Sequence, residues 1–403
     1  MSVKVEIGFT EAGNSAPFLT LDDSVKGLLN NTIFVLGGAE VLVDISEYFR
    51  SFNIQRGRSR ELEKYNAGQS SITFNNDERV FDPTFEASPF FGQIVPKRQI
   101  RVTADDEIQF EGTIEDWNIT YDAGGKSVAS CQAFDGFSFL TNITLDEEAV
   151  IEQRTNQRIE SILDTLEWPN AKRDVGFGGA TLASATIEPD TNALKYLETV
   201  SGSDPGDLFI SKNGSIKFVG RNVSFETGGI IFSDDGSQIS YQAIGVVYGS
   251  ELLYNKVTVT NNGSVATATN SVSVGLYGER DLVTETFLKD ADEQLEQLAN
   301  YLVNRYESPE YRIESLTTNL ETVTLGQRQQ LLQADLGDVV QIIFTPANIA
   351  PAINRYAKII GINQVQNPSE EIISLKFAST DGALFVLGDS VFGRLSEGNS
   401  LGW

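Results

Sequence analysis

The chain has 403 residues, and 30 Lys and Arg against 56 Asp and Glu give it a formal net charge of −26. A chain this acidic repels phosphate, which argues against sequence-specific binding of nucleic acids. It contains no histidine, which excludes Ser-His-Asp and Cys-His catalysis and histidine-ligated zinc. Its one cysteine, Cys131, cannot form an intrachain disulfide, and the alternating pattern around it predicts a buried apolar side chain.

Neither a signal peptide nor an apolar run long enough to span a membrane is found in the sequence. We therefore expect a chain that is made in soluble form in a cytoplasm.

A first β-rich region lies between Thr32 and Ala133, where apolar and polar residues mostly alternate as in half-buried antiparallel strands. The clearest such stretches are residues 71–74, 99–102, 108–114 and 126–133. Several short strands at this spacing are typical of a β-sandwich or β-barrel.

Helical patterns interrupt the strands in the middle of the chain. Ile159, Ile162, Leu163 and Leu166 have the spacing of one helix face, and Pro169 ends the segment. A second helix is expected to start at residue 190 or 191 and to bury Leu194 and Leu197. A hairpin over residues 208–219 follows, because Asn213-Gly214 suits its turn. This part of the chain is predicted to be a mixed α/β unit.

A second β-rich region follows and contains the strongest helix pattern of the chain, Leu295 to Tyr306, which Pro309 ends. The strands expected around this helix are residues 256–260, 264–269, 313–320, 339–344, 357–362 and 371–377. The last residues, Asp381 to Trp403, combine glycines with Phe385 and Phe392 and are expected to form an arm rather than a domain.

Carboxylates are the only plausible catalytic groups in this composition. Glu111, Glu115 and Asp116 lie around one predicted strand, and a glycosidase needs two carboxylates in one cleft. At this net charge, however, chance pairs are abundant, so a solvated surface is the favoured interpretation. The acidic segments Asp105-Asp106-Glu107 and Asp234-Asp235-Gly236 lack the ligand series of an EF-hand and are expected to form turns. The sequence therefore predicts no catalytic, cofactor-binding or metal-binding residue.

A basic loop stands out in this acidic chain. It runs from Arg56 to Glu61 and contains Arg58 and Arg60. Guanidinium groups form bidentate pairs with carboxylates, and the carboxylates could belong to this chain or to a neighbouring one. Arg56, Arg58, Arg60 and Glu61 are our candidate interface residues, with a surface loop paired within the chain as the alternative.

Several short segments also follow one another in a characteristic order. They are residues 43–46, 54–62, 74–83, 88–92, 110–112, 193–194, 218–221, 277–278, the Leu295 helix, 306–309 and 337–338. As an ordered set covering nearly the whole chain, they resemble the minor tail proteins of tailed bacteriophages. Residues 1–40 and the Gly-rich end match this pattern less clearly.

The resemblance implies a tail-hub protein, similar in fold to the baseplate hub of contractile phages and related injection machines. Such hubs are structural, carry no cofactor, and lie in the virion at the tail tip. Three copies would form a ring with pseudo-six-fold symmetry that closes or adapts the tail tube for DNA ejection. The implied partners are further copies of the chain, the distal tail protein or last tail-tube ring, the tape-measure protein, and a tail fibre or receptor-binding protein.

Periodicity and resemblance together predict a mainly β fold in which two tube-like β-barrels flank a small mixed α/β module. The expected divisions are an N-terminal segment (1–34), a first barrel (35–145), the α/β insert (146–250), a second barrel with one helix (251–380) and the C-terminal arm (381–403). The strands facing the bore should carry net negative charge, because Lys- or Arg-rich walls would retain DNA.

Two other functions remain as alternatives. One is a β-rich carboxylate glycosidase or depolymerase acting on envelope polysaccharide. The other is a carbohydrate-binding adhesin, which is the weaker of the two because Trp117, Trp168 and Trp403 are scattered along the sequence rather than grouped as in a sugar platform.

Overall fold

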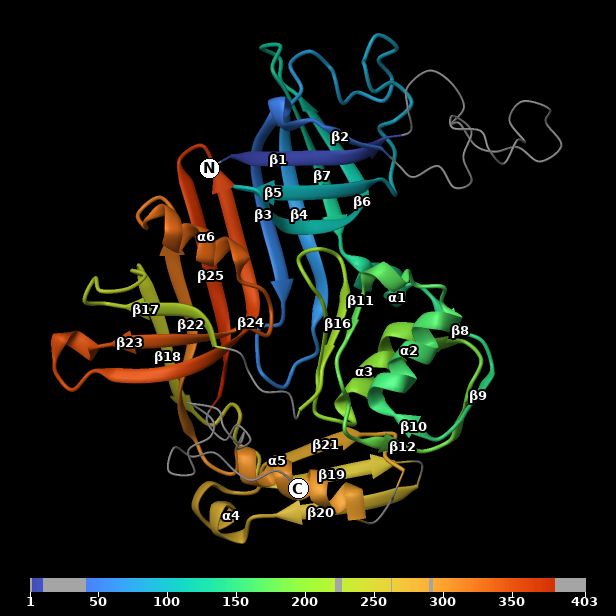
Figure 1. Ribbon diagram of the computed structural model, residues 1–403, viewed down its shortest axis with the longest axis vertical. Helices are drawn as coiled ribbons and strands as arrows, with labels where there is room; N and C mark the ends of the chain where they lie inside the picture. Colours follow the sequence, from blue (N-terminus) through green and yellow to red (C-terminus); the bar gives the residue numbers. More distant parts are fainter. Residues whose placement is uncertain (1, 10–40, 222–226, 262, 290–292, 381–403) are drawn as a thin grey trace.

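A single large sheet dominates the computed structural model, which describes residues 2–9, 41–221, 227–261, 263–289 and 293–380 (Figure 1). Within these ranges the sheet has 13 strands, and β17 and β23 branch from its main path at β24. The strands of the main path are, in spatial order, β18 (Ala243–Gly249), β22 (Glu310–Asn319), β25 (Glu370–Ser379), β24 (Ile353–Asn367), β3 (Phe49–Gly57), β4 (Asn66–Asn75), β7 (Ser127–Phe134), β6 (Glu107–Tyr121), β5 (Gln99–Ala104), β1 (Val3–Phe9) and β2 (Val41–Asp44). The branch consists of β23 (Val339–Phe344) and β17 (Thr227–Ser233). A mainly β fold with a mixed module is thus confirmed.

Alternating side chains place one face of the sheet on an apolar core. In β7, Ala129, Cys131 and Ala133 are fully buried, and the residues between them are half-buried. The core beneath β7 contains stacked aromatic rings, including Phe74, Phe81 and Trp117. The alternation predicted from the sequence for this region is confirmed. Cys131 is part of the core, as predicted.

The two β-rich regions join along β3 and β24. Gly361 is paired with Gly57, and the ladder continues through Asn363 and Gln55 to Gln366 and Phe52. Because β24 hydrogen-bonds to β3, residues more than 300 apart in sequence share one sheet. No closed barrel is found in the described part of the chain. The two tube-like β-barrel domains that we expected are not closed within the described chain, whose strands form two halves of one open sheet. The division into those two domains stays a prediction.

A mixed α/β module lies beside the first half of the sheet (Figure 1). Its helices are α1 (Gly136–Thr141), α2 (Thr155–Thr165) and α3 (Ala193–Gly202). Its strands are β8 (Thr144–Leu145), β9 (Glu148–Val150), β10 (Gln153–Arg154), β11 (Arg173–Val175), β12 (Thr181–Leu182), β13 (Ala185–Ile187), β14 (Thr191–Asn192), β15 (Asp207–Ile210) and β16 (Ile216–Val219). The two helices and the hairpin predicted here are confirmed; α1 was not predicted.

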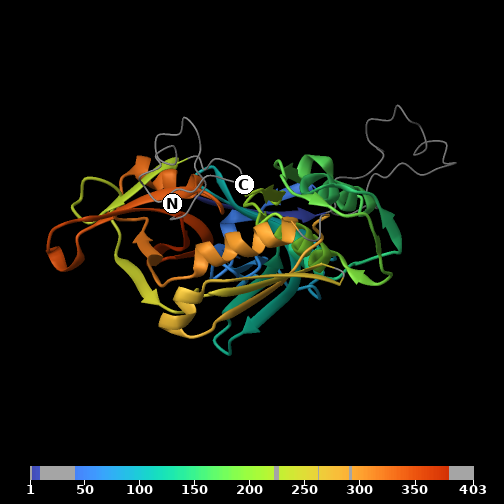
Figure 2. The ribbon, with the colours of Figure 1, turned by 90° about the horizontal axis from the view of Figure 1, so that it is seen from below.

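A second small module contains β19 (Lys256–Asn261), β20 (Ser264–Thr269), α4 (Ser271–Tyr277), β21 (Asp281–Glu285) and α5 (Glu293–Tyr306). The three strands form their own sheet, separate from the 13-stranded one. Figure 2 shows α5 lying along this sheet, and the predicted stripe Leu295, Leu298 and Leu302 is buried. The helix prediction is confirmed. The strands themselves lie outside the large sheet that holds the rest of the second β-rich region.

Two further strands differ in position from the expected divisions. β17 and β18 precede residue 250, yet they pair with β23 and β22 of the second half. β1 belongs to the first half of the sheet, where Val5 and Ile7 are fully buried.

The remaining helix, α6 (Leu325–Gln333), lies between β22 and β23 in sequence. None of the described helices is long and apolar enough to cross a membrane. The C-terminal arm and most of the N-terminal segment lie outside the described residues.

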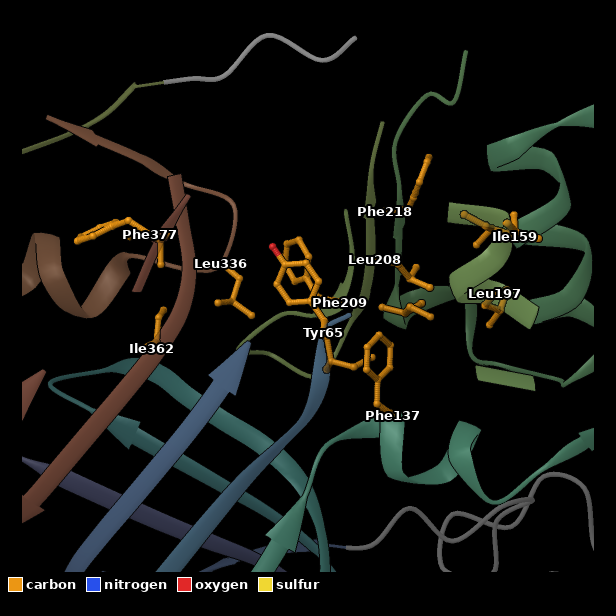
Figure 3. Close-up of a cluster of buried hydrophobic side chains, with 14 of the residues drawn as sticks. Tyr65, Phe137, Ile159, Leu197, Leu208, Phe209, Phe218, Leu336, Ile362 and Phe377 are labelled. Atoms are coloured by element: carbon orange, nitrogen blue, oxygen red, sulfur yellow. The ribbon is translucent and has the colours of Figure 1, made fainter. Parts of the chain in front are cut away.

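A shared core holds the modules together. Tyr65, which precedes β4, packs its ring 5.2 Å from that of Phe209 on β15. Figure 3 shows these rings between Leu336 on one side and Phe137 of α1 on the other. All four side chains are buried and belong to one cluster that extends into the second half of the sheet. The apolar joint therefore fixes the α/β module against both halves.

Candidate functional site

The basic loop reaches across the joint between the modules. Arg56, at the end of β3, donates from Nη1 to Asp335 Oδ1 at 2.6 Å, and its side chain is only 4% exposed. Asp335 also accepts the backbone N–H of Lys212 at 3.0 Å, which ties the β15–β16 hairpin to the same carboxylate. One ion pair thus connects the first half of the sheet, the second half and the α/β module.

Arg58 forms a second buried cluster. Its Nη2 lies 2.9 Å from Asp207 Oδ1, while Lys358 Nζ lies 2.6 Å from Asp207 Oδ2. The guanidinium also stacks 4.4 Å from the centre of the Tyr65 ring. Burial raises the pKa of the Asp207 carboxyl, but Lys358 and Arg58 outweigh it, so the pKa lies below its usual value. Asp207 is therefore held as a carboxylate.

Glu61 and Arg60 complete the loop. Glu61 accepts hydrogen bonds from Arg305 Nη2 at 3.1 Å and from the Tyr306 hydroxyl at 3.0 Å. Burial raises the pKa of Glu61, but Arg305 and Lys358 more than compensate, and the pKa is lowered. Arg60 pairs with Glu251 at 2.8 Å, and its side chain is 57% exposed.

The structure thus brings all four candidate interface residues into ion pairs within this chain. The alternative that we considered for this loop, pairing inside the chain, is what the geometry shows. Arg56 and Arg58 are buried against their own carboxylates, which leaves Arg60 as the exposed cation of the three. A contact between this loop and a neighbouring chain stays a prediction and now rests mainly on Arg60.

A buried carboxyl lies beneath the same joint. Asp135 accepts the backbone N–H of Gly68 at 2.7 Å and that of Phe137 at 3.0 Å, so it also caps α1. Burial raises the pKa of Asp135 to about 7, although both N–H groups and the Arg56 guanidinium act to lower it. At neutral pH this group titrates inside the core.

This raised pKa predicts a pH-dependent stability. A carboxyl whose folded-state pKa lies above its usual ~3.9 stabilises the fold fully below that usual value, and this contribution disappears as the pH rises through 7. Between pH 5 and pH 8, the free energy of unfolding of the wild-type chain, measured with urea, should fall by about 2 kcal/mol more than that of the Asp135→Asn variant, whose side chain cannot ionise. Parallel pH profiles for the two chains would contradict the assignment.

The carboxylates considered for catalysis are engaged elsewhere. Glu111 pairs with Arg101 at 3.2 Å and with Lys172 at 2.5 Å, and Glu115 pairs with Lys97. Asp116 is exposed on β6. No group of three or more potential metal ligands occurs within the described ranges. The predicted turn at residues 105–107 is confirmed, because Asp105 and Asp106 both have positive φ between β5 and β6.

The open face of the large sheet is a polar surface that the sequence analysis did not single out. Gln55 on β3 is paired in register with Gln69 on β4 and with Asn363 on β24, and this row continues to Ser374 and Thr317. The Gln69 amide donates to Gln55 at 2.8 Å, and the hydroxyls of Thr317 and Ser374 lie 3.0 Å apart. Neutral amides and hydroxyls therefore form this row on the face opposite the core.

A second row repeats this chemistry. Asn53 is paired with Ser71, and Ser71 with Gln132, whose amide donates to the Ser71 hydroxyl at 2.9 Å. A hollow of about 600 Å³ lies beside the first row, where β3 meets β24, and its lining includes the cationic residues Arg56, Arg58 and Lys376. The signal that identifies this face is the polar half of each alternating strand, which the sequence analysis used only to find strands.

The aromatic residues form no sugar-binding platform among the described side chains. Trp117 is packed in the core at 5.7 Å from the Phe81 ring, and Trp168 packs edge-on to Phe139 at 6.0 Å. Trp403 lies outside the described residues.

Comparison with known structures identifies the architecture. The fold is similar to that of a tail protein from Neisseria meningitidis MC58, with a TM-score of 0.61 and 12% identity over 95% of this chain and 98% of that one. It is equally similar to a 43 kDa tail protein of prophage MuSo2 from Shewanella oneidensis, with a TM-score of 0.59 and 12% identity over 94% and 98%. This chain has the fold of tail proteins.

A weaker likeness extends to secretion machinery. An Escherichia coli component of the type VI secretion system, itself described as similar to T4 phage tail proteins, matches with a TM-score of 0.50 and 7% identity. The match covers 82% of this chain and 73% of that one. No protein-family model and no curated protein match the sequence significantly. The tail-like architecture therefore rests on structural similarity.

Proposed function

We propose that this chain is the hub of a phage tail tip. The observation that carries the proposal is the similarity to two tail proteins over almost the full length of both partners, at TM-scores of 0.61 and 0.59. The ordered short segments between residues 43 and 338, which resemble those of minor tail proteins, support the same assignment independently.

The hub would be a homotrimer. Each chain supplies two β-rich halves, so three chains present six halves in a ring, which matches the six-fold symmetry expected of a tail tube. A closed symmetric ring needs one heterologous contact repeated three times. Closure of the open sheet into a tube would then occur between chains rather than within one. This ring would close or adapt the end of the tube during DNA ejection.

We assign the open face of the sheet to the bore. Its central rows carry Gln55, Gln69, Asn363, Asn53 and Gln132, which are uncharged. The amides and hydroxyls of these rows offer phosphates no cation to bind, and the second row continues from Gln132 to the exposed Asp116 on β6. The net negative charge that we expected for the bore wall stays a prediction, and DNA should not adhere to such a wall.

The partners of such a hub follow from its place in the virion. At its upper side it would meet the distal tail protein or the last tail-tube ring, and at its centre the tape-measure protein. A tail fibre or receptor-binding protein would attach outside. The exposed Arg60 of the basic loop is a candidate for one of these contacts.

The hub should have no hydrolase activity. Glu111 and Glu115 are held in ion pairs, and the fold is that of tail proteins. Incubation of the purified chain with host peptidoglycan and capsule should release no more product than a buffer control. Turnover that disappears in Glu111→Gln or Asp116→Asn would instead establish the glycosidase alternative.

Oligomeric state is the direct test of the proposed ring. Native mass spectrometry of the full chain should give a species of three times 44.1 kDa, about 132 kDa. A chain that stays monomeric at all concentrations, alone and with tail-tube protein, would contradict the hub.

A further inference from the structure

β18 and β6 each leave one edge open beside the polar face of the large sheet. β18 pairs with β22 on one side, and on its other side no backbone group of Ala243–Gly249 forms a hydrogen bond within the described ranges. β6 changes partner along its length, pairing with β5 up to Thr113 and with β7 from Thr113 to Tyr121. In the part of the chain that the structure describes, residues 115–121 therefore have no strand on the side away from β7. This stretch is as long as β18, which has seven residues.

β18 lacks the features that usually prevent an edge strand from pairing with another chain. Protected edges commonly carry a lysine, a proline, an inward-pointing charge or a bulge. The seven residues of β18 include neither a charged residue nor a proline. The irregularity in its ladder lies on β22, where Glu314 is the extra residue. An uncharged edge of this kind favours the addition of a further strand.

The apolar core is incomplete at both open edges. Ile244 and Val246 of β18 are only half-buried where they pack against the larger core cluster. Trp117 and Ile119 of β6 are half-buried against the other cluster. A strand laid along either edge would remove this apolar area from water, which is favourable.

Exposed tyrosines mark the same two edges. Tyr248 is 69% exposed and is paired in register with Tyr311 of β22, which is 39% exposed. Tyr121, at the end of β6, is 53% exposed. Tyrosine is enriched at protein–protein interfaces because its ring is apolar while its hydroxyl can hydrogen-bond. The two edges therefore have the composition of an interface.

Strand direction determines how the two edges meet between copies. From β6 to β18 the sheet runs through β7, β4, β3, β24, β25 and β22, and every neighbouring pair is antiparallel (Figure 1). This run has eight strands, so β6 and β18 point in opposite directions. A rotation about the tail axis keeps the direction of each strand along that axis. β18 of one copy is then antiparallel to β6 of the next.

We propose that β18 of one copy pairs antiparallel with residues 115–121 of β6 in the neighbouring copy. The occupant is a second copy because β6 carries the complementary open edge of the same sheet, and joining the two continues both the polar face and the core. The contact is heterologous, so repeating it three times closes a ring. This inference rests on the proposed function, since the trimer provides the neighbouring copy.

Disulfide trapping between two differently substituted chains tests the contact. One chain carries Val247→Cys on β18, and the other carries a cysteine on β6 in place of Asp116, Asn118 or Thr120. The native Cys131 does not compete, because it is fully buried. When the two chains are co-expressed and oxidised, a link between them should form within assembled trimers for at least one of the three β6 positions. Failure of all three would overturn the proposal.

The direction of pairing has its own readout. Moving the β18 cysteine from Val247 to Ala243 should move the preferred partner on β6 toward Thr120, because antiparallel strands number in opposite directions. A shift toward Asp116 would overturn the antiparallel arrangement. Thr267→Cys is the matched control for the β18 cysteines, since Thr267 is exposed on the edge strand β20 of the small sheet, and it should form no link to β6.

Lysines on the open edge give a test without cysteines. The Ala243→Lys/Tyr248→Lys double variant replaces two exposed residues of β18 and should raise the dissociation constant of the trimer by about 10-fold or more, while urea unfolding of the monomer stays unchanged. Val265→Lys is the matched control, since Val265 is 63% exposed on β20, and its trimer should dissociate as that of the wild type does.

The outcomes separate this pairing from the hub itself. A trimer that forms without the β18–β6 links, or that the two lysines leave intact, would overturn the pairing and leave the hub standing. A chain that forms no trimer would contradict both.

Discussion

The Arg56→Ala variant should lose about 3 kcal/mol of unfolding free energy. Its guanidinium is almost fully buried against Asp335, and removing one member of a buried pair leaves an uncompensated charge. The cost lies at the low end of the usual range because Asp335 keeps the Lys212 and Leu336 N–H groups. Chemical unfolding of the purified chain measures the effect.

Arg60→Ala is the matched control from the same loop. Its side chain is 57% exposed beside Glu251, so the loss should stay below about 1 kcal/mol. Arg58→Ala should fall between the two, because Lys358 still neutralises Asp207. Equal effects of Arg56→Ala and Arg60→Ala would contradict the buried joint. Replacing Arg56, Arg58 and Arg60 together by Ala should destabilise the monomer itself, because Arg56 and Arg58 are buried against Asp335 and Asp207.

Gly57→Ala should be destabilised by about 3–5 kcal/mol, through backbone strain and a steric clash together. Gly57 has φ +99°, and a Cβ there would lie 2.2 Å from the Ile360 carbonyl oxygen and 2.8 Å from the Gly361 Cα. Because both atoms belong to the facing backbone of β24, the clash can be relieved only by separating the two halves of the sheet.

Gly263→Ala isolates the conformational part of this effect. Gly263 also has φ +99°, but a Cβ there meets no atom within 4 Å, so its cost should be only about 1–2 kcal/mol. Thermal or urea unfolding of both variants gives the comparison. A Gly57→Ala chain as stable as Gly263→Ala would show that the β3–β24 junction is not closely packed.

The local pattern of apolar and polar residues predicted most strands and helices of this fold, but not which strands pair with one another. The alternation in β7 and the stripe of α5 are properties of neighbouring residues, and both were confirmed. The pairing of Gly57 with Gly361 depends on residues far apart in sequence, and alternation shows which face is buried without showing which strand lies alongside. This is why the alternation did not predict that the two β-rich regions share one open sheet.

The missed helices differ in how far the sequence could have revealed them. α6 begins with a capping box, in which Thr324 accepts the Gln327 N–H and Gln327 accepts the Thr324 N–H. That signal is visible in the sequence. α4 had no comparable pattern, because its apolar residues face solvent and its serine is buried, the reverse of an ordinary amphipathic helix.

The sequence predicted the kind of ion pair that the basic loop forms, but not the acidic residues with which its arginines pair. The loop Arg56–Glu61 was recognised as a place for guanidinium–carboxylate pairs, and such pairs exist. Their partners, Asp335 and Asp207, lie 279 and 149 residues further along the chain. Among 56 acidic residues, composition alone offers no way to choose them. The polar face, in contrast, follows directly from the register once the strands are paired.

A density map of the tail tip of the virion that encodes this chain tests the hub most directly. We predict three copies in a ring, with the two β-rich halves of each chain superposing after a rotation of about 60° around the tail axis. The face bearing Gln55, Gln69 and Asn363 should line the bore. A ring that lacks this internal superposition, a bore lined mainly by Lys and Arg, or the absence of the chain from the tail tip would contradict the proposal.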